Sequence, residues 1–169
     1  SSFVFDDGDY WNVKPDCKRY FKELLNGEKP DIVIFLIGLC DIFPCVTSKI
    51  DDLFKVDAII DDIVSPINMG KLIDSMEVAL PDAKFGISLI PPGNSRENSW
   101  YTLWGDSAGV WYFRNGQHRL VQRYIDHYKN INKVRFSMMP LYLNFDSFLG
   151  YNPSDCIHPN YYGTQQEAS

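Results

Sequence analysis

The stretch PDIVIFLIGLCD, residues 30–41, decides the fold class of this chain. After Asp31 it holds an unbroken run of β-branched and large apolar residues that reaches Ile37 and stops at Gly38. Such a run is typical of a strand buried on both faces of a parallel sheet. Gly38 is a strong signal for the end of that strand.

Two further strands are predicted later in the chain. KFGISLI, residues 84–90, is halted by Pro91-Pro92-Gly93, and residues 134–138 form a shorter candidate. Apolar side chains recur at helical spacing within residues 17–24, 69–80 and 120–128. This alternation predicts an α/β fold, a three-layer, flavodoxin-like parallel sheet with helices on both faces.

Two long connections separate these elements, residues 43–65 and 91–109. Long connections after strand ends in α/β folds often carry function. Aromatic residues crowd the second connection and its exit, where they either line a substrate groove or pack the loop onto the body.

Composition limits the classes of partner. The chain has 169 residues, which suits a single domain, and a formal charge of −6, which argues against nucleic acid. No apolar run reaches the roughly 20 residues needed to span a bilayer. The cysteines show no paired C-x-x-C spacing, so a zinc framework is not expected, and the disulfide state and the compartment stay open.

The chemically most informative stretch is Asp155-Cys156-Ile157-His158. An Asp three residues before a His on a turn can place its carboxylate against one ring nitrogen. The ring is then held in the tautomer whose other nitrogen accepts a proton from a hydroxyl group. The same spacing also occurs in turns with no chemical role.

The order of these features resembles that of SGNH (GDSL-type) hydrolases over residues 28–168. Members of that family have a strand ending in G-x-N-D, a later strand ending in Pro-Pro and a closing D-x-x-H-P-N-x-x-G. The corresponding residues are Gly38 to Asp41, Pro91-Pro92, and Asp155 and His158 followed by Pro159, Asn160 and Gly163.

The resemblance implies an esterase or lipase that acts on an ester or an acetylated carbohydrate, with no metal and no cofactor. His158 would be the general base, Asp155 its orienting partner, and Gly38 with Cys40 would border the oxyanion pocket. The family's G-D-S nucleophile segment has no counterpart in residues 1–30. The resemblance therefore implies that the amino-terminal βα unit is absent, that the serine lies outside this sequence, and that this chain alone is inactive. An uncovered strand edge would also favour association into oligomers.

Several alternatives remain open. Gly105-Asp106-Ser107 does not follow a strand, so we expect a loop turn there rather than the nucleophile. Cys40 stands where the family has an Asn, and a thiol is a poorer donor to an oxyanion. Cys40 as nucleophile, Gly8 as an oxyanion-binding glycine, and a metal site of Asp41, Asp155 and His158 are further hypotheses. The same features also fit a non-catalytic relative that serves as a binding or structural module.

Overall fold

The computed structural model describes residues 4–5, 14–15, 17–19, 21–22, 25–129 and 135–168. Strands β3 (Ile32–Phe35), β4 (Lys84–Ser88) and β5 (Phe136–Met139) form one parallel sheet in the order β3-β4-β5. A short antiparallel pair, β1 (Val4–Phe5) and β2 (Lys14–Pro15), is separate from it. The predicted α/β class with an all-parallel sheet is confirmed.

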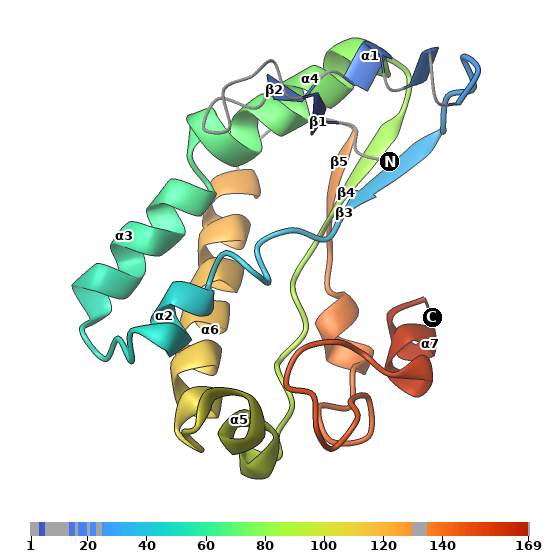
Figure 1. Cartoon of the computed structure of the whole chain (residues 1–169). Coiled ribbons are helices and arrows are strands. Elements are labelled where there is room, and N and C mark those ends of the chain that lie inside the picture. Colours follow the sequence, from blue (N-terminus) through green and yellow to red (C-terminus); the bar gives the residue numbers. More distant parts are fainter. Residues whose placement is uncertain are drawn as a thin grey trace.

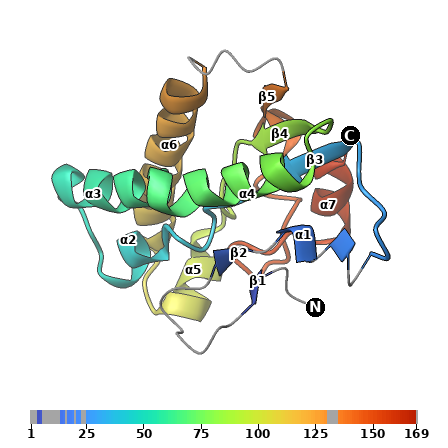
Figure 2. The same cartoon turned by 90° about the horizontal axis from the view of Figure 1, so that it is seen from above.

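Helices occupy most of the chain between these strands (Figure 1). The described helical elements are α1 (Cys17–Arg19), α2 (Phe43–Thr47), α3 (Leu53–Ile63), η2 (Pro66–Gly70), α4 (Lys71–Ala79), α5 (Glu97–Trp104), α6 (Gly109–Tyr128), η3 (Leu141–Asn144) and α7 (Tyr161–Glu167). Seen from above, α3 and α4 follow one another across the molecule (Figure 2). The predicted helical stripes at residues 69–80 and 120–128 coincide with helices. Of the first stripe, Cys17 lies in α1, whereas Tyr20 and Leu24 lie outside the described residues. In the described part of the chain, no helix is long and apolar enough to cross a membrane.

Helix α6 forms the centre of the core. Its Phe113, Leu120 and Tyr124 side chains are fully buried. Phe113 packs against the buried Trp100 of α5, with ring centroids 5.2 Å apart. Of the aromatic residues near the second connection, these two therefore belong to the core and do not line a groove.

The three strands are not buried alike. In β4, every residue after Lys84 is buried, as predicted. In β3 the two faces differ, because Phe35 is buried whereas Ile32 and Ile34 are 62% and 50% exposed. The expected burial of this strand on both faces is therefore wrong. The reason is that burial of a strand face depends on which elements pack against it, and in the described structure the face that carries Ile32 and Ile34 is only partly covered.

The two predicted long connections also contain helices. Residues 43–65 form α2 and α3, and residues 91–109 contain α5. Helix α3 begins where the Asp52 carboxylate accepts a hydrogen bond from the backbone N–H of Phe54. It buries Val56 and Ile60, which are four residues apart and share one helix face. Helices within these connections were not predicted, although the spacing of Val56 and Ile60 indicates the one at α3.

Candidate functional site

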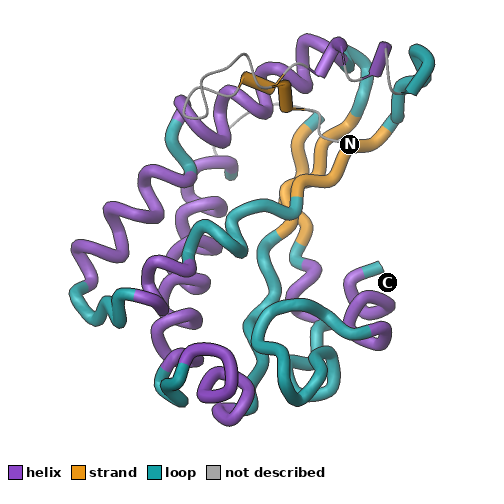
Figure 3. The backbone as a smooth tube through the Cα atoms, in the orientation of Figure 1, coloured by secondary structure: helices purple, strands orange, loops and turns teal. Residues whose placement is uncertain are grey.

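The chain leaves β3, β4 and β5 at the same end of the sheet (Figure 3). That end is the usual position of ligands in open α/β sheets, because the connections that follow parallel strands gather there. Residues 36–42 follow β3, residues 89–96 follow β4, and the loop at residues 145–160 comes after β5 and η3. The predicted site residues lie on the first and last of these segments.

Asp155 and His158 are in direct contact. The Nδ1 atom of His158 is 3.0 Å from Oδ2 and 3.2 Å from Oδ1 of Asp155. The Oδ1 atom of Asp155 also accepts hydrogen bonds from the backbone N–H groups of Ile157 and His158, both at 2.9 Å. The turn predicted from the D-x-x-H spacing therefore places the carboxylate against one ring nitrogen.

The environment of Asp155 favours its ionised form. Partial burial acts to raise the pKa of Asp155, but hydrogen bonds from His158 and from the backbone N–H of Ile157 lower it more. The net effect holds this pKa below its ordinary value of 3.8. An ionised carboxylate can only accept hydrogen bonds, so the proton in this contact resides on Nδ1 of His158.

With the proton on Nδ1, the second ring nitrogen of a neutral His158 imidazole carries the lone pair. The side chain is 75% exposed, and no described residue forms a hydrogen bond with Nε2. A neutral imidazole held in this tautomer is the form that accepts a proton from a hydroxyl group. The arrangement is chemically competent as a general base with an orienting carboxylate.

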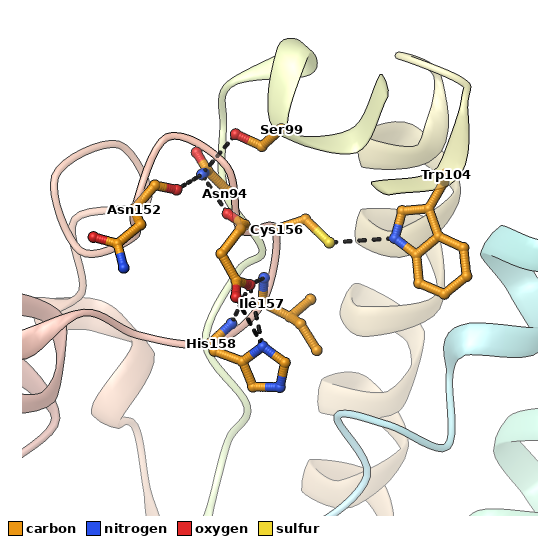
Figure 4. Close-up of polar contacts among 8 residues, drawn as sticks. Asn94, Ser99, Trp104, Asn152, Cys156, Ile157 and His158 are labelled. Carbon is orange, nitrogen blue, oxygen red and sulfur yellow. Dashed lines mark hydrogen bonds and ion pairs between the residues drawn. The ribbon is translucent and has the colours of Figure 1, made fainter. Parts of the chain in front are cut away.

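The loop that carries this pair is held to the segment that follows β4. Arg96 donates a hydrogen bond from Nη1 to the carbonyl oxygen of Tyr151 at 3.2 Å. Tyr151 is buried and donates one from its hydroxyl group to the carbonyl oxygen of Pro92 at 2.6 Å. The buried side chain of Asn94 points into the same loop (Figure 4). Sequence reasoning treated residues 91–93 only as a strand terminator and missed Asn94, for which no local pattern gives a signal.

Gly38 has a structural reason to be a glycine. Its backbone φ is +103°, and a Cβ atom there would lie 2.6 Å from Cδ2 of Leu120. The residue therefore lets the end of β3 approach α6 closely. Among the described residues no hydrogen bond or ion pair joins Gly38 or Cys40 to His158.

Trp104 contacts both α2, which follows β3, and the loop that carries His158. Trp104 donates a hydrogen bond from Nε1 to Sγ of Cys156 at 3.3 Å (Figure 4). The Trp104 ring also stacks on Phe43, the first residue of α2, at 5.3 Å between centroids. Cys40, three residues before Phe43, is exposed, and Cys40, Cys45 and Cys156 are free thiols.

The Gly105-Asp106-Ser107 sequence forms a turn, as expected. Gly105 ends α5 with a left-handed φ of +67°. Asp106 accepts a hydrogen bond from the backbone N–H of Ala108 at 2.9 Å and pairs with Lys49 at 2.7 Å. Ser107 therefore lies in a link between two helices and not on a strand-to-helix turn. Gly8 falls outside the described residues.

A cavity of about 530 Å³ opens beside the connection from β3 to α2. Its volume is in the range of about 300–1,000 Å³ that is usual for small-molecule sites. The wall combines apolar side chains with two carboxylates and an amide: Ile37, Asp41, Pro44, Ile59, Asp62, Ile63, Asn68, Met69 and Leu72. Within the described ranges, no group of three His, Cys, Asp or Glu side chains is placed to hold a metal ion, including the hypothetical set of Asp41, Asp155 and His158.

Comparison with known proteins gave no match: no family model, no curated protein and no solved structure is similar to this chain.

Proposed function

We propose that this chain supplies the base and its orienting carboxylate for a serine esterase or acyl hydrolase of the SGNH kind. The supporting observation is the contact between Nδ1 of His158 and the Asp155 carboxylate, in a turn that leaves Nε2 accessible. The D-x-x-H-P-N sequence and its position at the carboxyl end of a parallel sheet agree with that class.

In the proposed reaction, Nε2 of His158 takes the proton of a serine hydroxyl group as the serine oxygen attacks the ester carbonyl carbon. Asp155 stabilises the imidazolium that results. His158 then returns the proton to the leaving alcohol, and a water molecule hydrolyses the acyl-enzyme with His158 again as base. We assign the serine to a segment outside residues 1–169.

The thiol of Cys40 affects the rate of hydrolysis that we expect. If the end of β3 borders the oxyanion, a thiol there donates a weaker hydrogen bond than the amide of an asparagine. Loss of one such donor typically lowers kcat about 10²–10³-fold. We therefore propose either a slow hydrolase or one that uses another donor, on an ester or acetylated carbohydrate.

The test is hydrolysis of short acyl esters by the natural protein together with any sequence that precedes Ser1. We expect His158→Ala to abolish turnover and Asp155→Asn to lower it strongly, because the amide no longer selects the correct tautomer. His118→Ala is the matched control, since His118 is exposed on α6 and has no hydrogen bond or ion pair with Asp155 among the described residues. Activity that is indifferent to His158→Ala would refute the proposal.

A second candidate is a non-catalytic binding module. The observation in its favour is the cavity beside Asp41, whose apolar wall and two carboxylates suit a molecule with an apolar body and a positive charge. The thermal midpoint measured with octylamine distinguishes the two functions. The binding module would be favoured if octylamine raises the thermal midpoint, Leu72→Trp removes this rise, and the protein has no esterase activity.

A further inference from the structure

We infer that Asn94 is the positioning residue for the Asp155–His158 pair. A role of Asn94 in catalysis rests on the proposed function, whereas its effect on the geometry of the pair does not. Asn94 is fully buried and lies four residues beyond Ile90, at the end of the Pro91-Pro92-Gly93 run that follows the central strand.

The side-chain amide of Asn94 is fully used. Its Nδ2 atom lies 2.7 Å from the carbonyl oxygen of Asp155, 3.1 Å from that of Asn152 and 2.9 Å from Oγ of Ser99 (Figure 4). Its Oδ1 atom accepts a hydrogen bond from the backbone N–H of Arg96 at 3.0 Å. The amide nitrogen therefore donates to the loop and to Ser99, whereas the amide oxygen accepts a hydrogen bond from the segment that carries Asn94.

The backbone of Asn94 continues this attachment. Its N–H donates a hydrogen bond to the carbonyl oxygen of Cys156 at 2.9 Å, and its carbonyl oxygen accepts one from Nε1 of Trp100 at 2.8 Å. Asn94 thus binds the carbonyl groups of both Asp155 and Cys156. The main chain that carries the carboxylate is therefore attached to the segment after β4 through two neighbouring carbonyl groups.

The segment on which Asn94 sits is itself closely packed. A Cβ atom at Gly93 would lie 2.7 Å from the Trp100 ring and 2.9 Å from Phe113. Ser99 reinforces the attachment, because its hydroxyl group donates a hydrogen bond to the carbonyl oxygen of Pro153 at 2.6 Å. The residues joined in this way are up to 61 positions apart in the sequence.

The amide group is specific to this task. A carboxylate of the same shape keeps the contact with the backbone N–H of Arg96 but turns an oxygen toward the carbonyl oxygens of Asn152 and Asp155. That arrangement leaves buried acceptors unpaired and adds repulsion between oxygens. Asn94→Asp should therefore release the loop while it changes the buried volume little.

The decisive readout is the tautomer of His158, followed by ¹⁵N NMR of the imidazole in this 169-residue chain. We expect the Nδ1–H tautomer to predominate in the original chain and to lose its preference in Asn94→Asp. Amide exchange at Ile157 and His158 should accelerate by at least about tenfold, the effect of one lost hydrogen bond.

Gln117→Glu is the matched control. Gln117 is also a buried amide and donates a hydrogen bond to the carbonyl oxygen of Ile90 at 3.0 Å, but it bonds to no described residue of the loop. The same amide-to-acid change there should leave the tautomer of His158 unchanged. An Asn94→Asp variant that loses stability without a change in the His158 tautomer would show a structural role only and would overturn the inference.

Ser99→Ala provides a second, milder variant if Asn94→Asp does not fold. It removes one acceptor of the Asn94 amide and the contact with Pro153, so we expect a smaller change in the same direction. An unchanged tautomer and unchanged exchange in Ser99→Ala, or in a folded Asn94→Asp, would overturn the inference.

The catalytic part is measured separately in the natural protein. Misplacement of a catalytic group by about 1 Å can cost roughly 10²-fold in rate, so Asn94→Asp should lower kcat on that order with KM within about threefold. If His158→Ala leaves hydrolysis intact, the proposed function fails, yet the tautomer result still decides whether Asn94 positions the pair.

Discussion

Tyr124 of α6 donates a hydrogen bond from its hydroxyl group to the carbonyl oxygen of Ile37, 3.1 Å away, where the chain leaves β3. The contact fixes the end of the strand onto the central helix. Burial above all raises the pKa of Tyr124 well above its ordinary value, so the hydroxyl group remains a donor at every ordinary pH.

Tyr124→Phe removes this donor and leaves a carbonyl oxygen unpaired at the end of β3. We expect the free energy of unfolding to fall by about 1–3 kcal/mol, the usual cost of an unsatisfied buried acceptor. Urea unfolding measures it. Tyr161→Phe is the control, because Tyr161 is 80% exposed on α7 and its loss should change stability little. Equal effects of the two variants would contradict the assignment.

Gly38→Ala tests the close approach of β3 and α6. The new methyl group would meet Leu120 at 2.6 Å, and the backbone φ of +103° is unfavourable for alanine. We expect a loss of about 2–5 kcal/mol in the free energy of unfolding, the sum of backbone strain and overpacking.

Gly27→Ala separates the two contributions to that loss. Gly27 also has a positive φ, +83°, but nothing lies within 4 Å of the position that a methyl group would take there. Only the backbone cost of about 1–2 kcal/mol should appear in this variant. A Gly38→Ala effect no larger than that of Gly27→Ala would show that Leu120 adjusts freely.

The exposed face of β3 predicts self-association. Ile32 and Ile34 of β3 and Leu36 just after it are each about half exposed, and alternate residues of an extended chain point to the same side. Light scattering should show oligomers of this chain, and Ile34→Lys should reduce them because a charge blocks strand pairing. Phe54→Lys is the control, since Phe54 is 88% exposed on α3. A monodisperse monomer of the original chain would contradict the prediction.

Asp155 predicts a pH dependence of stability. Its pKa is lower in the folded chain than its ordinary value of 3.8, so the unfolded chain binds the proton more tightly. The stabilisation by Asp155 is therefore complete above that ordinary value and is lost as the pH falls through the folded pKa. The difference in unfolding free energy between the original chain and Asp155→Asn should be constant near neutral pH and shrink in strong acid. A difference that grows on acidification would have the wrong sign.

The parts of the fold that sequence predicted are those set by neighbouring residues. The apolar run that forms β3 and the contact between Asp155 and His158 both arise within a few positions. The exposed face of β3 was missed, because burial depends on which elements pack against a strand. Asn94 was missed for a related reason, since its partners Asn152 and Asp155 are 58 and 61 residues away. Helix α3 differs, because the spacing of Val56 and Ile60 was visible and was assigned to a loop.

If His158 activates a serine, that serine should react with a fluorophosphonate. In the natural protein an activated serine oxygen attacks the phosphorus atom and fluoride leaves, so mass spectrometry of peptides locates the adduct. We predict one adduct, on a serine outside residues 1–169, that forms in the original protein and in His118→Ala but not in His158→Ala. No adduct, an adduct on Ser107 or Cys40, or an adduct that persists in His158→Ala would show that His158 does not activate such a serine.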